Sequence, residues 1–249
     1  GVAAQGDGLA DRLAYIAIAL LVAGFAVKTG AVPFHSWLPD AHQSADTSVS
    51  VLLSGIVIKI AGAYGLMTVC DLFCNVPAVR ASMAVLGAVS IVAGALLASR
   101  QGHFKRVVAY SSVSQMGYIL LALSTGTALG TTAALAHIFS HAVFKSTLFA
   151  NAASLHEQVG TLEMSELGGL EERMPKTAFS CVIAFLSTAG IPPMAGFWSK
   201  LLILLALWTS GARALAAFAL LSSILTAAYL LRVQRLVFLS RRGDHRAER

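Results

Sequence analysis

The residues best suited to acid–base chemistry lie on one apolar stretch, 131–153. His137, His141 and Lys145 follow one another at intervals of four residues, so on a helix their side chains share one face. Histidine has a usual pKa of about 6.5 and can both accept and release a proton near neutral pH. This face could therefore carry a proton relay. Packed neutral histidines, or an i, i+4 pair binding a metal, would show the same spacing.

Four lysines lie in or beside apolar segments, at Lys28, Lys59, Lys145 and Lys200. Lys59 is near the middle of its segment, where the side chain cannot readily reach the lipid headgroups. An ionisable group at that depth costs about 2.5–3.5 kcal/mol on insertion scales and is a functional candidate by default. The alternative for Lys59 is a structural pair with an unseen carboxylate, and for Lys28 it is a helix end at the headgroups.

Lys200 lies at the end of the stretch 190–200, which separates two short apolar runs, 177–189 and 201–208. An interruption of a helix would therefore set the position of this lysine. Neither run alone crosses a bilayer, which takes about 20 apolar residues. Proline removes an amide donor and clashes with the preceding turn. Broken backbone at membrane depth is tolerated only when it is buried in protein or lines a wet cavity. We therefore predict a broken helix at one end of an ion path. The residues of the two predicted interruptions are Gly190, Pro192, Pro193 and Gly196, with Pro33 in a weakly similar stretch beside Lys28.

The composition is that of an integral membrane protein. The chain has 249 residues, of which 57% are hydrophobic and 12% charged, and its mean hydropathy is +0.74. Soluble domains carry about 25% charged residues. The apolar segments are roughly 15–25 residues long, which favours helices over a β-barrel. The net charge of +6 gathers at segment ends, so it indicates membrane topology and no nucleic-acid binding.

We expect an all-α membrane fold of about seven transmembrane helices, one or two of them broken. The expected helices are 13–27, 47–69, 81–98, 107–123, 131–153, the broken helix 177–208, and 215–237. The stretch 34–42 is expected to form an interfacial or re-entrant turn. The connection 154–176 is polar, and its recurring leucines predict a partly amphipathic interfacial helix.

Basic loops give the expected orientation. The loop 99–106 and the tail 241–249 both carry several Lys and Arg residues, and short basic segments stay on the cytoplasmic side. Four expected helices separate the two, which places both on one side and the start of the chain outside. We expect a prokaryotic cell (inner) membrane with the C-terminal tail in the cytoplasm.

The helix 107–123 carries a polar stripe of Ser111, Ser114, Gln115 and Tyr118 at helical spacing. The stripe could hold water beside the His/Lys face, or it could join helices through small polar contacts. No Asp or Glu falls within an expected membrane segment. A lysine path is modulated by opposite charge, so we expect a carboxylate from a missing segment or a partner subunit.

The three cysteines, Cys70, Cys74 and Cys181, lack the further ligands and spacing of a metal site. We interpret them as inert thiols and expect no metal. The sequence contains no cofactor motif, so we expect no bound cofactor.

Several ordered motifs resemble the antiporter-like, proton-conducting membrane subunits of respiratory complex I, energy-converting membrane-bound hydrogenases and Mrp-type cation/proton antiporters. The resemblance begins in the stretch 27–42, Val-Lys-Thr-Gly-Ala-Val-Pro-Phe-His-Ser-Trp-Leu-Pro-Asp-Ala-His. It continues through Lys59, the His137/His141/Lys145 series and the Gly-Ile-Pro-Pro sequence from Gly190 to Lys200. It covers nearly the whole chain.

This resemblance implies a pair of inverted five-helix repeats. Residues 1–79 would be the end of the first repeat, 80–240 the second, and 241–249 the basic tail. Lys28 would pair with a glutamate on an earlier helix that this sequence lacks. Lys59 and the His137/His141 face would belong to a central hydrophilic axis, and Lys200 would be its terminal ionisable site. A complete member would carry more helices before Gly1 and usually one after Arg249, on this or another polypeptide.

Three functions follow as hypotheses. The first is a proton-translocating subunit of a redox-driven pump of the quinone-reductase or hydrogenase type, without redox chemistry of its own. Protons would pass along Lys28, Lys59, His137/His141 and Lys145 and leave near Lys200. The second is a component of a multisubunit Na⁺/H⁺ antiporter without a redox partner. The third is a membrane scaffold whose buried lysines only lock helices together. The first two imply other membrane subunits as partners, protons or sodium ions as substrates, and the bilayer as surroundings.

Overall fold

The computed structural model describes residues 3–73 and 75–240, with side chains from Arg12 onward. Cys74 and the predicted tail 241–249 lie outside the described residues. The helices are α1 (Ala3–Thr29), α2 (Trp37–Ser44), α3 (Thr47–Leu52), the π-helix η1 (Leu53–Tyr64), α4 (Gly65–Leu72), α5 (Pro77–Ser99), α6 (Phe104–Ser124), α7 (Ala128–Val159), α8 (Leu170–Arg173), α9 (Pro175–Ala189), α10 (Ala195–Thr209), α11 (Arg213–Gln234) and the π-helix η2 (Arg235–Leu239).

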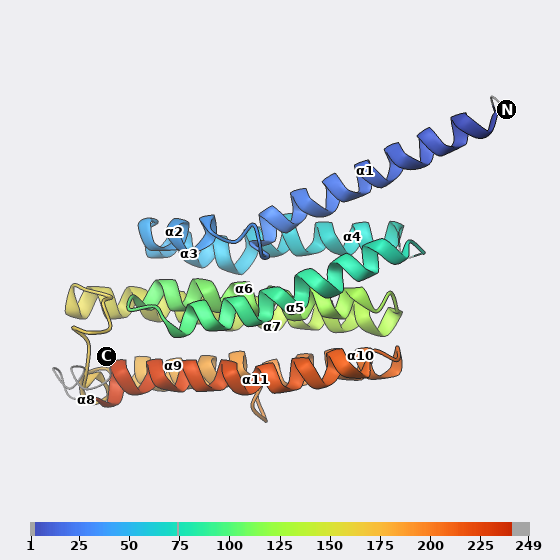
Figure 1. Cartoon of the computed structure of the whole chain (residues 1–249). Helices are drawn as coiled ribbons and strands as arrows, with labels where there is room; N and C mark the ends of the chain where they lie inside the picture. Colours follow the sequence, from blue (N-terminus) through green and yellow to red (C-terminus); the bar gives the residue numbers. More distant parts are fainter. Residues whose placement is uncertain (1–2, 74, 241–249) are drawn as a thin grey trace.

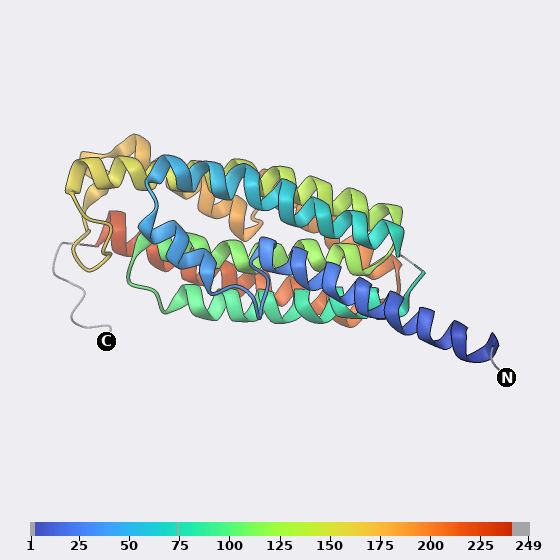
Figure 2. The same ribbon diagram turned by 90° about the horizontal axis from the view of Figure 1, so that it is seen from above.

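The helices form an elongated bundle of layers (Figure 1). α9, α10 and α11 make one layer, α5, α6 and α7 the middle one, and α2, α3 and α4 the layer beyond. Seen from above, the long helices run nearly along one direction, and the N-terminal part of α1 projects away from them (Figure 2). The centre of the bundle is α6, of which 94% is buried. A helix that is buried all round lies in the core of its bundle.

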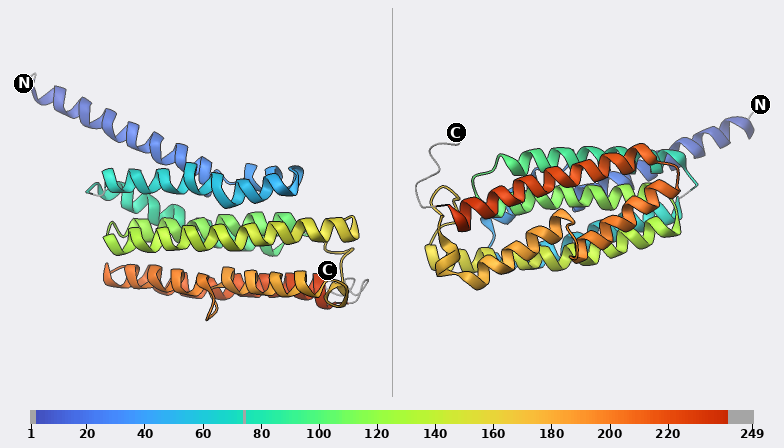
Figure 3. Two further views of the ribbon diagram at one scale, coloured as in Figure 1. Left: turned by 180° about the vertical axis from the view of Figure 1, so that it is seen from behind. Right: turned by 90° about the horizontal axis from the view of Figure 1, so that it is seen from below.

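Five spans in the described residues are long and apolar enough to cross a membrane: Arg12–Thr29, Thr47–Leu72, Pro77–Ser99, Phe104–Ser124 and Arg213–Leu239. The two remaining predicted crossings correspond to α7 and to the pair α9/α10. Figure 3 shows the interruption between α9 and α10, where the chain leaves the helical axis and returns to it. The all-α prediction and the predicted break are confirmed.

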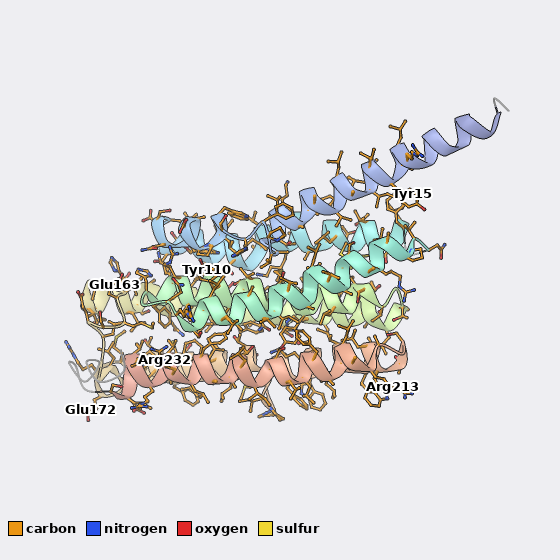
Figure 4. All side chains as sticks on the ribbon, in the orientation of Figure 1. Tyr15, Tyr110, Glu163, Glu172, Arg213 and Arg232 are labelled. Carbon is orange, nitrogen blue, oxygen red and sulfur yellow. The ribbon has the colours of Figure 1, made fainter. Side chains whose placement is uncertain are left out.

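Charged side chains mark the ends of the bundle. Figure 4 places Glu163, Glu172 and Arg232 at one end and Arg213 at the other. The first of these ends also carries the loop 99–106, because an Arg232 guanidinium nitrogen donates a hydrogen bond to the Ser99 carbonyl at 2.7 Å. We call it the basic end.

The connection after α7 differs from the prediction. α7 continues to Val159, so the polar connection begins later than residue 154. Its only helix among the described residues is α8, with four residues. Leu162, Leu167 and Leu170 are all buried, so their spacing reflects contact with the bundle. The predicted interfacial amphipathic helix is wrong, because these leucines cover protein and not lipid.

Two features hold α2 on the middle layer. The Arg106 guanidinium on α6 donates to the Asp40 carboxylate at 2.6 Å and to the Gln43 side-chain oxygen at 2.9 Å. The His42 ring of α2 stacks on Phe149 of α7, with ring centroids 4.4 Å apart. The predicted interfacial turn therefore includes a short helix fixed against α6 and α7.

Candidate functional site

α7 carries a buried row of ionisable side chains. His137, His141 and Lys145 each have 0% exposure, and the two imidazole centroids lie 6.3 Å apart. Phe144, itself buried, lies near both rings and contacts them edge-on. The structure thus brings the predicted relay residues together in the interior, on the face of α7 that meets α6 and α10.

α6 receives the end of this row. The Lys145 ammonium donates to the Val108 carbonyl at 2.9 Å and to the Ser111 hydroxyl. Ser111 in turn donates to the Val108 carbonyl at 2.8 Å. A buried ammonium needs such partners, because an uncompensated charge in a low-dielectric interior is very costly. The carbonyl and hydroxyl accept hydrogen bonds but carry no negative charge, so neither of them neutralises the Lys145 ammonium.

Lys59 flanks the row from η1. Its side chain is 3% exposed and its ammonium donates to the Ser54 carbonyl one turn earlier. The π-helical backbone around it is wider than an α-helix, and such segments are frequent at functional sites. The charge of Lys59 acts on both His141 and Lys145. Lys59 is therefore an electrostatic neighbour of the row.

His137 continues the row to α10 through Ser199. The His137 Nδ1 and Ser199 Oγ atoms lie 2.9 Å apart, and the Ser199 hydroxyl donates to the Gly196 carbonyl at 3.1 Å. Because this hydroxyl proton is engaged, Ser199 accepts a hydrogen bond from Nδ1–H of His137. The imidazole is thereby assigned as the Nδ1–H tautomer, with Nε2 as the acceptor that has no partner among the described residues.

Replacing Ser199 by alanine is expected to lower proton transport roughly tenfold or more, because positioned proton-transfer groups contribute about 10²–10⁴-fold and the tautomer would no longer be fixed. The pH profile of transport should change, while Ser199→Thr, which keeps the hydroxyl, should restore it. Both variants would be measured in the assembled complex. An unchanged profile in the alanine variant would show that Ser199 does not act on His137.

Lys200 lies at the predicted break. Its side chain is 5% exposed, and its ammonium donates to the last carbonyls of α9, those of Thr188 at 2.9 Å and Ala189 at 3.1 Å. A helix C-terminus has unpaired carbonyls and a partial negative charge that favours a cation. The ammonium also lies 4.4 Å from the centroid of the Tyr118 ring. The break thus supplies the electrostatic partner that a buried lysine requires, without a carboxylate.

Polar atoms without partners accompany the row. Within the part of the chain that the structure describes, these buried atoms form no hydrogen bond: Ser54 Oγ, Ser114 Oγ, both amide atoms of Gln115, Nε2 of His137 and both ring nitrogens of His141. Buried polar groups are normally satisfied by protein or by ordered water. Their arrangement favours the water-holding interpretation of the α6 stripe over helix joining alone.

Lys28 is placed differently. It is exposed at the last turn of α1 and lines a cavity of about 250 Å³ with Trp37 and Ile58. The structure does not join it to the row, and its predicted role in the path stays a prediction. Its neighbour Thr29 is buried against η1, where a Cβ on Gly62 would meet the Thr29 amide nitrogen at 2.9 Å.

Sequence reasoning missed His42 as a site residue. Its ring is fully buried, and neither nitrogen has a hydrogen-bond partner in the described residues. Phe149, on which it stacks, lies one turn beyond Lys145 on α7. The signal that could have found it was the motif in 27–42, which ends on this histidine. The Ser50 hydroxyl donates to the His42 carbonyl at 3.2 Å and fixes the end of α2.

A polar cavity of about 440 Å³ opens beside α2 at the basic end. Its lining includes Lys105, whose ammonium donates to the Ala45 carbonyl at 2.9 Å. Burial lowers the pKa of His103 in the same lining, and the Glu163 carboxylate opposes that shift. The cavity gathers polar groups from α2, α6 and the end of α7 at the basic end.

A metal centre has no ligand set within residues 3–73 and 75–240, where no group of three or more His, Cys, Asp or Glu side chains could hold an ion. Cys181 is a buried free thiol, and Cys70 is also buried. An ion pair joins Arg106 and Asp40 outside the row, whereas within residues 3–73 and 75–240 the ammonium groups of Lys145 and Lys200 donate to a hydroxyl and to backbone carbonyls.

Comparisons with known proteins agree with this geometry. Residues 4–226 match the family described as NADH:quinone oxidoreductase/Mrp antiporter, TM. A chain 4 of NAD(P)H-quinone oxidoreductase from a Synechococcus strain is 38% identical over 239 residues, which cover 91% of this chain and 44% of the relative. The chain therefore spans less than half the length of this curated relative.

Two solved assemblies contain chains of similar structure. The Mrp complex from Dietzia sp. superposes with a TM-score of 0.86 at 30% identity, covering 91% of this chain and 42% of the other. Respiratory complex I from Thermus thermophilus gives a TM-score of 0.76 at 32% identity, covering 90% and 49%. The chain is thus an all-α membrane protein and belongs to the NADH:quinone oxidoreductase/Mrp antiporter transmembrane family.

Proposed function

We propose that this chain is a proton-translocating membrane subunit of a redox-driven ion pump, working beside other membrane subunits. The observation that carries the proposal is the buried row of Lys145, His141, His137 and Lys200, flanked by Lys59 and by unpaired polar atoms. Intramembrane ionisable groups facing a bundle interior are typical of proton relays.

Electrostatic coupling would move protons along the row. A proton on one side chain makes protonation of the next less favourable, because like charges interact more strongly in a medium of low dielectric constant than in water. Neutral imidazoles between two lysines can accept a proton from one side and release it to the other. We further propose that the basic end faces the cytoplasm of a prokaryotic cell, so that protons are taken up there and leave beyond Lys200.

The redox drive would come from partner subunits. The relative from Synechococcus is named as a quinone oxidoreductase chain, and the row described above can carry protons without a cofactor of its own. A charge or conformational signal from a partner would change the protonation of Lys28 or Lys59 first, since α1, which carries Lys28, and η1, which carries Lys59 between α3 and α4, lie on the other side of the middle layer from α9 and α10 (Figure 1). The two-repeat organisation of residues 1–79 and 80–240 remains part of this proposal.

A second candidate is a subunit of a Na⁺/H⁺ antiporter that has no redox partner. The observation that favours it is the higher TM-score with the Mrp complex, 0.86 against 0.76 for complex I. The same lysines and histidines would carry the proton, and sodium would cross elsewhere in the assembly.

The two candidates are separated by transport in the purified complex, reconstituted into lipid vesicles. We expect oxidation of the electron donor to drive proton movement in sodium-free buffer, and Lys59→Ala to lower it at least about tenfold without loss of assembly. Exchange of sodium for protons under an imposed gradient, with no electron donor, would instead support the antiporter. Lys59→Ala pumping at the wild-type rate would remove Lys59 from the path.

A further inference from the structure

Ser111, the α6 partner of Lys145, lies next to further buried polar side chains outside the row. Its hydroxyl accepts a hydrogen bond from Lys145 and donates to the Val108 carbonyl. A hydroxyl oxygen can accept two hydrogen bonds, so one acceptor position of Ser111 remains. Ser111 is fully buried, and α11 also packs against α6, where the Tyr118 hydroxyl of α6 contacts the Ala219 carbonyl of α11.

The α11 side chain close to Ser111 is Tyr229. α6 and α11 run antiparallel, and the Tyr118 hydroxyl donates to the Ala219 carbonyl at 3.1 Å. Two turns toward the basic end, the Tyr229 hydroxyl lies close to the side chains of Ser111 and Thr226. Tyr229 is 3% exposed, and its hydroxyl makes no hydrogen bond of standard geometry within the described part of the chain. It is a buried polar group aimed at the partner of Lys145.

Gln234 lies five residues beyond Tyr229 toward the basic end and is the last residue of α11. Its side chain is 8% exposed, and its Oε1 atom is also without a partner among residues 3–73 and 75–240. Arg232, two residues earlier, is bonded to the Ser99 carbonyl, which places this part of α11 beside the basic loop. Tyr229 and Gln234 are thus two buried polar side chains on the part of α11 between the level of Ser111 and the basic end.

We propose that Tyr229 is a proton-transfer residue that connects Lys145, through Ser111, with water at the basic end beside Gln234. This inference rests on the proposed function, since it supplies protons to the same row. The proposed route runs between helices α6 and α11 and is separate from the polar cavity beside α2.

The transfer is a relay of hydroxyl protons. With Lys145 as a neutral amine, the Ser111 hydroxyl turns from the Val108 carbonyl and gives its proton to the amine nitrogen. The Tyr229 O–H bond breaks as its proton forms the new O–H bond of Ser111. A hydronium ion arriving from the Gln234 side returns a proton to the Tyr229 oxygen and becomes water, so the net change is one proton moved to Lys145.

A purely structural role predicts a different outcome for Tyr229→Phe. The variant keeps the ring and removes a buried hydroxyl that makes no hydrogen bond of standard geometry in the described residues, and such a removal is neutral or stabilising for the fold. A purely structural role therefore predicts wild-type transport by Tyr229→Phe, whereas the relay predicts that transport is lost. Loss of transport in a complex that assembles normally would therefore distinguish the two roles.

The experiment measures donor-driven proton transport by the reconstituted complex carrying Tyr229→Phe. We expect transport to fall at least about tenfold, with normal assembly and an unchanged or higher midpoint of thermal unfolding. The matched control is Tyr110→Phe, a buried tyrosine of α6 whose ring faces Arg106, and it should transport as wild type. Equal losses in both variants would overturn the proposal.

Two further measurements complete the test. Fluorotyrosine at position 229 keeps the hydroxyl but makes it more acidic, so the alkaline limb of the pH profile should move to lower pH. An unmoved profile would contradict the relay. Wild-type transport by Tyr229→Phe beside lost transport in Lys145→Met would overturn the Tyr229 inference alone. Wild-type transport by both variants would overturn the proposed function.

Discussion

Lys145→Met is expected to abolish donor-driven proton transport while leaving the complex assembled. Lys145 is fully buried at one end of the row, and its ammonium donates to Val108 and Ser111 of α6. Methionine has a similar length and no charge, so proton transfer past this point would lose its acceptor. We expect a loss of at least about 100-fold, the lower end of what a positioned proton-transfer group contributes, measured as acidification in sealed vesicles.

The stability of this variant separates transport from scaffolding. Replacing a buried charge by an apolar side chain of similar volume is often neutral or stabilising by about 1–4 kcal/mol. A proton-path lysine therefore predicts normal amounts of assembled complex, whereas a lysine that locks helices together predicts poor assembly. Lys176→Met is the control, because Lys176 is exposed at the start of α9 and outside the row. Poor assembly with normal transport in the remaining complex would support the scaffold hypothesis.

Structural features could be predicted from the sequence where residue type alone dictates the backbone conformation or the burial of a side chain. Glycine and proline at 190–193 cannot continue a helix, so the break between α9 and α10 could be predicted without knowledge of the fold. The four-residue spacing of His137, His141 and Lys145 fixes their common face in any helix. Their burial follows from their polarity, because ionisable groups on a membrane helix face the bundle interior.

The remaining features depend on contacts between helices that are distant in the sequence. Ser199 acts on His137 because α10 returns against α7, and Tyr229 reaches Ser111 because α11 lies beside α6. Neither residue has a local pattern that reveals its partner. The π-helical turns around Lys59 also lack a residue signature, since apolar periodicity does not distinguish π from α geometry over a single stretch.

One missed partner could have been predicted from general chemistry. We expected a carboxylate from a missing segment or a partner subunit to modulate the lysine path, and in the described residues Lys200 donates instead to the last carbonyls of α9. The last carbonyls of every helix lack intrahelical donors, so a lysine that follows a break by a few residues is well placed to cap the preceding half-helix. The break and its lysine thus stabilise each other, and disturbing one should disturb the other.

Gly196→Ala is therefore expected to damage both the break and transport. A Cβ at this position would collide with the Ser187 carbonyl of α9, and the Gly196 amide now donates to the Ser187 hydroxyl at 3.2 Å. The start of α10 must move away from α9, which also moves Ser199 and Lys200. Overpacking of a closely packed site costs about 1–3 kcal/mol or more. We expect less assembled complex, a lower midpoint of thermal unfolding, and transport below about one tenth of wild type per assembled complex.

The control for this variant is a helical glycine with open space around it. At Gly24 of α1, an added Cβ would meet no atom within 4 Å, and alanine in a helix interior is favoured over glycine by roughly 0.5–1 kcal/mol. Gly24→Ala should keep assembly and transport at wild-type levels. If Gly196→Ala also keeps both, then α9 and α10 can separate without consequence, and Lys200 would not need the carbonyls of α9 to carry its charge within the membrane.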